Sequence, residues 1–182
     1  MSAKYYVDAN GKYLGAFGDG AKAPPGAIER NAPPRDGRQI WDTNASAWRD
    51  SSELLLDYAS NLRLEKEIGG VEIGGMVVAT DDRSKALING AFNMVTTDPS
   101  IVLKFKVASG FVDLDAAAVT AIAMAVGAHV QSCFAKEAEA HEAIDNGTIT
   151  SKEQIDTLFS ASPQQAEPQL AKKTATKGRK SS

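Results

Sequence analysis

The sequence is poor in the side chains from which reactive sites are usually built. Its 182 residues include one cysteine, Cys133, and two histidines, His129 and His141. A single thiol cannot close an internal disulfide, which is typical of folding in a reducing compartment. The histidines fall in one predicted helix, twelve residues apart. A helical rise of about 1.5 Å per residue puts them too far apart to bind one metal ion together.

Long apolar runs are also missing. No stretch approaches the roughly 18 consecutive apolar residues that a membrane helix needs. The start, Met1–Asp8, has one lysine and no apolar region of the kind found in signal peptides. Gly69, Gly70, Gly74 and Gly75 lack the Lys-Ser/Thr of a P-loop and the G-x-G-x-x-G spacing. We therefore expect no membrane insertion, no secretion through a signal peptide and no nucleotide-binding loop.

Charge is distributed unevenly along the chain. Residues 51–159 carry eight Lys or Arg against sixteen Asp or Glu, a net charge of −8, whereas residues 160–182 carry five against one, a net charge of +4. The acidic body would repel phosphate backbones, and the basic end supports at most weak, salt-sensitive binding to polyanions. Nucleic acid is therefore not the expected partner. Residues 160–182 also have too little apolar content to fold, so we predict a disordered tail.

Residues 1–50 predict a small β-rich module. Four of the seven prolines lie here, which excludes a long helix. Asn10-Gly11 separates the strand-like runs Tyr5–Val7 and Lys12–Leu14, a pattern typical of a β-hairpin. A second strand-like stretch, Gln39–Trp41, follows.

Six of the twelve aromatic residues also lie in these fifty residues. Two interpretations stay open: the rings form a miniature core, or they form a docking surface, because tyrosine and tryptophan combine a large contact area with polar tips. The candidate partner-binding residues of the second interpretation are Tyr5, Tyr6, Tyr13, Trp41 and Trp48.

Residues 51–159 predict the main body, because apolar spacing switches there between helical and strand-like patterns. The predicted elements are helix 52–67 ending at Gly69-Gly70, hairpin 71–78, helix 81–95, strand 101–107, helix 115–145 and a short helix ending at Leu158. The expected fold class is therefore α+β: a small β-rich module in 1–50, helices packed with short β-hairpins and one long C-terminal helix in 51–159, and the disordered basic tail in 160–182.

Local signals predict how these helices begin. Thr80 or Asp81 caps the second helix, and Asp113 or Asp115 caps the long one. Thr150–Glu153 has the spacing of a capping box. Gly90 lies inside the second helix, where glycine costs about 1 kcal/mol relative to alanine. A close crossing of another element would explain that glycine.

No set of residues predicts catalysis. Cys133 and Phe134 belong to the apolar stripe of the long helix, and buried thiols of this kind are usually inert. His129 lies beside that stripe, where we expect a hydrogen bond toward the hairpin or the preceding strand. Asp81-Asp82 is explained by the helix start, and the acids near residue 140 by a solvated face. The sequence therefore predicts no catalytic residue, no metal and no cofactor.

Four blocks of the chain carry a resemblance to a known family: Gly69–Asp81, Ala86–Phe92, Gly110–Ala117 and Ala128–Glu139. In this order they resemble the domain of unknown function that recurs in phage and prophage tail-fibre and tail-fibre-assembly proteins. The shared features are a glycine turn before a Thr-Asp helix start and an A-H-V-Q-x-C-F run. The resemblance covers roughly residues 52–147, and it makes His129 and Cys133 family features without assigning them a role.

The first fifty residues resemble, more loosely, the starts of phage tail-fibre-assembly proteins. Tyr6–Gly15 and Trp41–Trp48 match the outline Y-x-x-x-G-x-Y-x-G followed by W-D and a second tryptophan. A typical large C-terminal chaperone part is absent, which is a departure from that pattern.

The resemblance implies a non-enzymatic bacteriophage tail accessory protein whose partners are tail-fibre or baseplate proteins. Two roles stay open, a structural virion subunit and a tail-fibre assembly chaperone, and a homo-oligomer is compatible with both. The expected location is the virion tail, the host cytoplasm during assembly, or both. A polyanion-binding or hydrolytic phage factor is the alternative.

Overall fold

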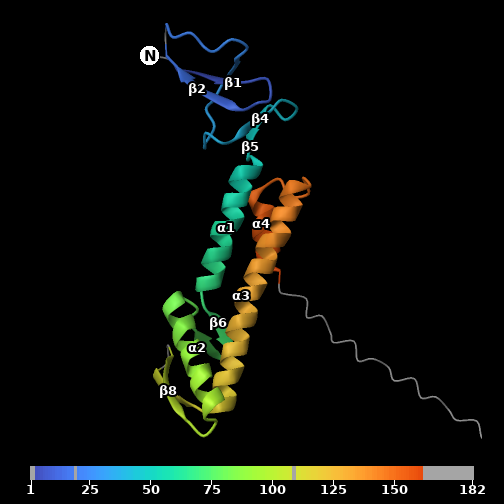
Figure 1. Cartoon of the computed structure of the whole chain (residues 1–182). Helices are drawn as coiled ribbons and strands as arrows, with labels where there is room; N and C mark the ends of the chain where they lie inside the picture. The colour runs from blue at the N-terminus through green and yellow to red at the C-terminus, as the bar shows by residue number, and fades with distance from the viewer. Residues whose placement is uncertain (1–2, 19, 108–109, 162–182) are drawn as a thin grey trace, which may run out of the picture.

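The longest helix, α3 (Ala116–Asp145), is the element along which the rest of the body is arranged. The computed structural model describes residues 3–18, 20–107 and 110–161. The N-terminal strands lie at one end of an elongated molecule, and α3 runs through the helical part (Figure 1). The fold class is α+β, as the sequence predicts. Most of the predicted basic tail, from residue 162 on, lies outside the described residues.

Helices and hairpins pack along α3 in two groups. The C-terminal half of α3 packs with α1 (Ser52–Ile68) and α4 (Lys152–Ser160). The N-terminal half packs with α2 and two antiparallel hairpins (Figure 1). The bounds of this second group are α2 Asp82–Thr97, β6 Val71–Ile73 paired with β7 Met76–Val78, and β8 Leu103–Val107 paired with β9 Gly110–Leu114.

Five short strands form the N-terminal module, in two sheets. The bounds are β1 Lys4–Val7, β2 Tyr13–Phe17, β3 Ile28–Arg30, β4 Ile40–Asp42 and β5 Ala47–Arg49. The first three form an antiparallel sheet in the order β2-β1-β3, and β4 pairs with β5. The β1–β2 hairpin confirms the prediction from Asn10-Gly11. Strand β3 was not predicted, because a three-residue segment with two charged side chains carries no alternation signal.

Acidic and hydroxyl side chains cap the helices as the sequence predicts, with the alternatives now resolved. Asp81, not Thr80, caps α2 by accepting from the Ser84 backbone N–H at 3.1 Å. Asp115 caps α3. Asp113 instead lies in β9, where its carboxylate pairs with Lys104. These caps satisfy backbone N–H groups that the first helical turn leaves without partners.

Several local predictions are wrong. No described element crosses α2 at Gly90, since a methyl group built there meets nothing within 4 Å. The capping box of α4 is shifted by one residue: Gln154 accepts from the backbone of Ser151. Phe134 is 45% exposed rather than part of the buried stripe, because the cation of Arg63 on α1, and not an apolar side chain, lies over its ring at 4.6 Å. Strand β8 begins at Leu103, two residues later than predicted.

Two separate apolar clusters hold the body together, and α3 contributes to both. One joins α1, the end of α3 and α4, with Leu55, Ala140, Ile144, Ile155 and Phe159 among its buried residues. The other joins the hairpins, α2 and the start of α3, with Val78, Ile88, Val95, Val119 and Ile122 among its buried residues. Burial of these side chains supplies the main driving force for packing.

A buried carboxylate links the two groups of elements. Glu67, at the end of α1, is 6% exposed and accepts from Lys85 of α2 at 2.6 Å and from Arg63 of its own helix. Arg63 also donates to Glu137 of α3 at 3.0 Å. Thr80 is fully buried and its hydroxyl donates to the Glu67 backbone carbonyl at 2.5 Å. This network, which we call the Glu67 network, ties α1, α2 and α3 at the junction of the two clusters.

Replacing Glu67 by Gln should destabilise the body by about 3 kcal/mol at pH 7, because Lys85 and Arg63 lose a buried counter-ion. The hydrogen bond from Lys85 first, and then that from Arg63, lowers the Glu67 pKa against the opposing effect of burial. A carboxyl whose pKa is lower in the folded protein than in the unfolded chain stabilises the fold at pH values above its unfolded pKa of about 4.3. That contribution is lost as the pH falls through the pKa of the folded protein. The difference in the free energy of unfolding between wild type and Glu67→Gln, measured by urea unfolding, should therefore become smaller from pH 7 to pH 3.5. Glu65→Gln, an exposed change on the same helix, is the control. A deficit that stays constant with pH would contradict the role of the charge.

Candidate functional site

The candidate docking residues of the N-terminal module are brought together in part. The rings of Trp41 and Trp48 meet edge to face at 5.4 Å between centroids, and Tyr13 meets Trp48 at 5.7 Å. The guanidinium of Arg30 lies over the Trp41 ring at 4.8 Å. All three rings are half-buried. They therefore pack on one another and still leave part of each ring at the surface.

Tyr5 and Tyr6 point to opposite faces of their sheet, because successive residues of a strand alternate. The strand pairing puts Tyr5 on the face of Arg30, whereas Tyr6 shares the other face with Glu29 and Phe17. Tyr6 meets Phe17 at 5.5 Å, and its hydroxyl donates to Glu29 at 3.4 Å. Of the five predicted residues, Tyr13, Trp41 and Trp48 thus meet, whereas Tyr5 and Tyr6 lie on opposite faces of the other sheet. Whether any of them binds a partner stays a prediction.

Gly11 fastens the two sheets of the module to each other. Its backbone carbonyl accepts from the Trp41 N–H at 2.8 Å, and its φ is +82°. A methyl group at this position would come within 2.3 Å of the Trp41 carbonyl oxygen. Glycine is required here for both reasons, and the position of Trp41 depends on it.

Polar contacts attach the module to the start of α1. Gln39 donates to Asp50 at 2.9 Å, and Arg38 bonds Asp57 and lies 3.8 Å from Glu53. The hydrogen bonds that Arg38 donates to Asp36, and then the one that it donates to Asp57, raise the Arg38 pKa. These charges are exposed to solvent, where ion pairs stabilise only weakly.

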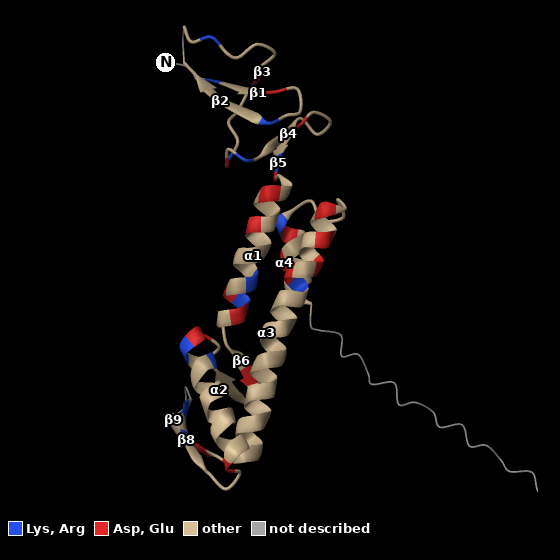
Figure 2. Cartoon of the chain, viewed as in Figure 1, with Lys and Arg blue, Asp and Glu red and all other residues tan. Residues whose placement is uncertain are grey.

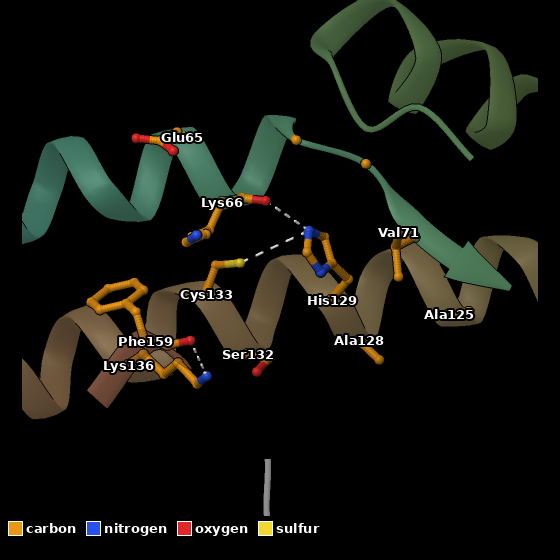
Figure 3. Close-up of a pocket in the computed structure, with 12 residues that line it drawn as sticks. Glu65, Lys66, Val71, Ala125, Ala128, His129, Ser132, Cys133, Lys136 and Phe159 are labelled. Carbon is orange, nitrogen blue, oxygen red and sulfur yellow. Dashed lines mark hydrogen bonds between the residues drawn. The ribbon is translucent and has the colours of Figure 1, made fainter. Parts of the chain in front are cut away.

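A pocket of about 670 Å³ opens at the middle of α3, between the two apolar clusters (Figure 3). Its walls come from the end of α1, the start of β6, one face of α3 and the last turn of α4. The lining residues are Glu65, Lys66, Gly69, Gly70, Val71, Ala125, Ala128, His129, Ser132, Cys133, Lys136 and Phe159. The pocket exists because α4 ends at Ser160, while α3 continues past it uncovered on that side.

His129 in this pocket caps the end of α1. Its Nε2–H donates to the Lys66 backbone carbonyl at 3.1 Å (Figure 3). This carbonyl lies in the last turn of α1, where it also accepts a long hydrogen bond from the Gly69 N–H at 3.4 Å. The expectation of a bond toward the hairpin or the preceding strand is wrong, because α1 lies closer to the ring than either. The contact requires the tautomer with the proton on Nε2.

Cys133 beside it has the environment of an inert thiol. The thiol is in contact with His129, Sγ lying 3.9 Å from Nε2 (Figure 3), but that nitrogen already carries the proton given to Lys66. Burial foremost, and then the charge of Glu67, raises the Cys133 pKa. A nucleophilic thiol needs a lowered pKa or a free base beside it. This pair therefore offers neither.

Lys136 closes the pocket at the α4 end. Its ammonium group donates to the Phe159 carbonyl at 2.8 Å and to the Ala161 carbonyl, so it satisfies the C-terminal end of α4 (Figure 3). The other charged residues of the lining are Glu65 and Lys66 of α1, and the rest of the lining is uncharged. In the described ranges, no group of three or more His, Cys, Asp or Glu side chains is placed to hold a metal ion. The pocket is large enough to accept a side chain or a small ligand.

The sequence names several lining residues but does not predict the pocket itself. The sequence analysis names Gly69-Gly70, His129 and Cys133, each for a feature of its own segment. Their meeting depends on the packing of α1 along α3, and no spacing within one segment reports such a contact. The charged residues Lys66 and Lys136 carried no signal, since helical lysines are usually solvated.

The thiol environment predicts slow alkylation of Cys133. At pH 8 the native protein should react with iodoacetamide about 100-fold more slowly than the urea-unfolded chain, because the side chain is 6% exposed and must open to react. His129→Ala should accelerate the reaction by uncapping α1 and opening the pocket. Fast alkylation of the wild type below pH 7 would instead reveal a thiolate and a reactive site.

Comparison with known proteins places the body of the chain in a family. Residues 50–161 match the model described as Domain of unknown function (DUF4376), and this range is more than half of the chain. No curated protein and no solved structure matches the sequence. The matched range contains the two apolar clusters, the Glu67 network and the pocket. The chain belongs to the DUF4376 family.

Proposed function

We propose that this chain is a bacteriophage tail accessory protein that works by binding other tail proteins and has no enzymatic activity of its own. The phage context is supported by the four ordered blocks that resemble domains of tail-fibre and tail-fibre-assembly proteins. The mode of action is supported by the surfaces of the molecule and by the raised pKa of its single thiol.

The observation that carries the binding role is the cluster of Tyr13, Trp41 and Trp48. Three large rings in mutual contact beside the cation of Arg30 form a rigid, partly exposed surface. Tryptophan, tyrosine and arginine are the residues that most often dominate binding energy in protein interfaces. Rings already ordered by their neighbours lose little conformational entropy when a partner binds.

The place of this cluster suits a docking role. The N-terminal module lies at one end of the elongated molecule, beyond the start of α1 (Figure 1). Its sheets leave the strands β2, β3 and β5 each with one unpaired edge among the described strands, whereas β4 bonds Gly11 along its outer edge. An extended segment of a tail-fibre or baseplate protein can add to such an edge while its side chains contact the rings.

Stoichiometry distinguishes the two forms of this role. A structural subunit stays in the virion tail at a symmetric copy number, whereas an assembly chaperone acts in the host cytoplasm and is missing from mature particles. Quantitative mass spectrometry of purified virions decides between them.

The docking role predicts that Trp41→Ala combined with Trp48→Ala weakens capture of tail-fibre or baseplate proteins by at least tenfold, since each buried ring contributes 1.4 kcal/mol or more when it is a binding anchor. The measurement is affinity purification from infected cells with the captured proteins identified and quantified. The helix signal of residues 51–159, followed by far-UV circular dichroism, should stay intact.

Phe111→Ala is the matched control, because this ring is 74% exposed on β9 and lies outside the module. This variant should capture tail-fibre or baseplate proteins in the same amounts as the wild type. Loss of the helix signal in the double variant would mean that the rings are core residues, and unchanged capture with intact helices would reject the docking surface.

A further inference from the structure

The aromatic cluster, defined as Tyr13, Trp41 and Trp48, is accompanied by a cation that has no counter-ion among the described residues. This cation is the guanidinium of Arg30, which lies over the Trp41 ring at 4.8 Å. Its Nη1 donates to the Glu29 backbone carbonyl in a long hydrogen bond of 3.4 Å, and its Nε is buried with no described acceptor. Because an arginine side chain has only donors, this side of the cluster has more donors than acceptors.

The described carboxylates of the N-terminal module are all bonded to groups other than Arg30. Glu29, the preceding residue of β3, points to the other face of the sheet, because successive residues of a strand alternate. There it pairs with Lys4 at 3.0 Å. The others are Asp8, Asp36, Asp42 and Asp50. Asp19 lies outside the described residues. Within the described part of the chain, no acid neutralises Arg30.

A second arginine of this chain shows the complete arrangement. Arg63 is also half-buried and lies over an aromatic ring, that of Phe134, at 4.6 Å. Unlike Arg30, it bonds two carboxylates, those of Glu67 and Glu137. Such charge-assisted bonds are the stronger ones, and the planar guanidinium matches the shape of a carboxylate. The Arg30 site has the cation and the ring, and a carboxylate from outside the described chain would complete it.

The position of Arg30 on an edge strand lets another protein reach it. Strand β3 pairs with β1 on one side, and its outer edge has no neighbour among the described strands. Ile28 shares the face of Arg30, because the two lie two residues apart on this strand, and it is 42% exposed. An extended segment added to this edge would place alternate side chains beside Ile28 and Arg30.

We propose that the partner presents an extended acidic segment to the edge of β3, with a carboxylate paired to Arg30 and an apolar side chain two residues away packed on Ile28. This inference rests on the proposed function, because it names the chemistry of the segment that the aromatic cluster binds. A carboxylate has only acceptors and therefore complements the excess of donors. Because stacking on Trp41 already orders the guanidinium, pairing costs little further side-chain entropy.

Single-stranded nucleic acid is a poorer occupant, although aromatic rings and arginine also bind stacked bases. Such binding requires several cations along the phosphate backbone, whereas Arg30 is the one described cation that lies over these rings. The adjoining body, residues 51–159, has a net charge of −8, and Figure 2 shows its acidic residues on α1 and α3. This charge repels a polyanion far more than a segment with few carboxylates.

Tryptophan fluorescence of the full chain tests the pairing, because Trp41 and Trp48 are its two tryptophans and both belong to the cluster. The probes are the peptide acetyl-Thr-Val-Thr-Glu-Thr-Val-Thr-amide and its analogue with Gln in place of Glu. Valine on both sides places an apolar residue beside Ile28 in either strand direction. The wild type should bind the Glu peptide at least about tenfold more tightly, since hydrogen bonds to charged groups are stronger. Salt should reduce this preference.

Arg30→Gln should abolish the preference, whereas Arg30→Lys should keep part of it, because lysine retains the charge without the planar fork. Arg49→Gln is the matched control. Arg49 is an exposed arginine of β5 that neighbours Trp48 in the strand and points to the other face, so its loss should leave the preference unchanged. Equal urea midpoints would show that the variants fold alike. The comparison of the two peptides on the wild type needs no variant.

Equal affinity of the wild type for both peptides, failure of both to bind, or a preference that survives in Arg30→Gln would overturn the proposal. Tighter binding of oligothymidylate than of the Glu peptide would overturn it too and would make nucleic acid the occupant. These outcomes are distinct from failure of the proposed function. That failure would appear as unchanged capture of tail proteins by the variant with Trp41→Ala and Trp48→Ala, whichever peptide the wild type prefers.

Discussion

The body of this protein depends on the burial of one side of α3. Two apolar clusters form on that side, one with α1 and α4 and one with α2 and the hairpins. They have no buried residue in common, and α3 is the helix that contributes buried residues to both. Each cluster alone is small for an independent domain. A single continuous helix shared by both, with Asp115 capping its start, makes the packing of one cluster favourable for the other.

The Glu67 network stands where these two clusters meet. Its ion pairs come from three helices, and Thr80 fixes the backbone at the end of α1. The buried polar side chains described there have hydrogen-bond partners, so polar contacts help to hold the junction. The same junction leaves the pocket, because α1 ends at Ile68 and α4 at Ser160, while α3 passes between them. His129 and Lys136 complete the ends of those two helices. The positions of His129 and Lys136 in the pocket are therefore explained by helix termination.

Sequence signals predicted the elements that are specified locally. Gly11, Gly74 and Gly75 have the positive φ that their turns need, and the aspartates at 81 and 115 accept from the first turns of helices. Features specified by tertiary contact were missed. Strand β3 exists because it pairs with β1. In the sequence, Glu67 has the pattern of a solvated helix residue, and only the fold places Lys85 beside it. Gly90 was assigned an intramolecular crossing that the fold does not contain.

Hydrogen exchange along α3 tests the central claim, that this helix joins both clusters into one cooperative unit. Measured by mass spectrometry on the full chain, buried amides of α1, α2 and both halves of α3 should open with the same free energy, because loss of either cluster removes the support of the other. Exchange of α2 and the N-terminal half of α3 at a clearly lower free energy than α1 would contradict the claim. It would show two independent units joined by a helix.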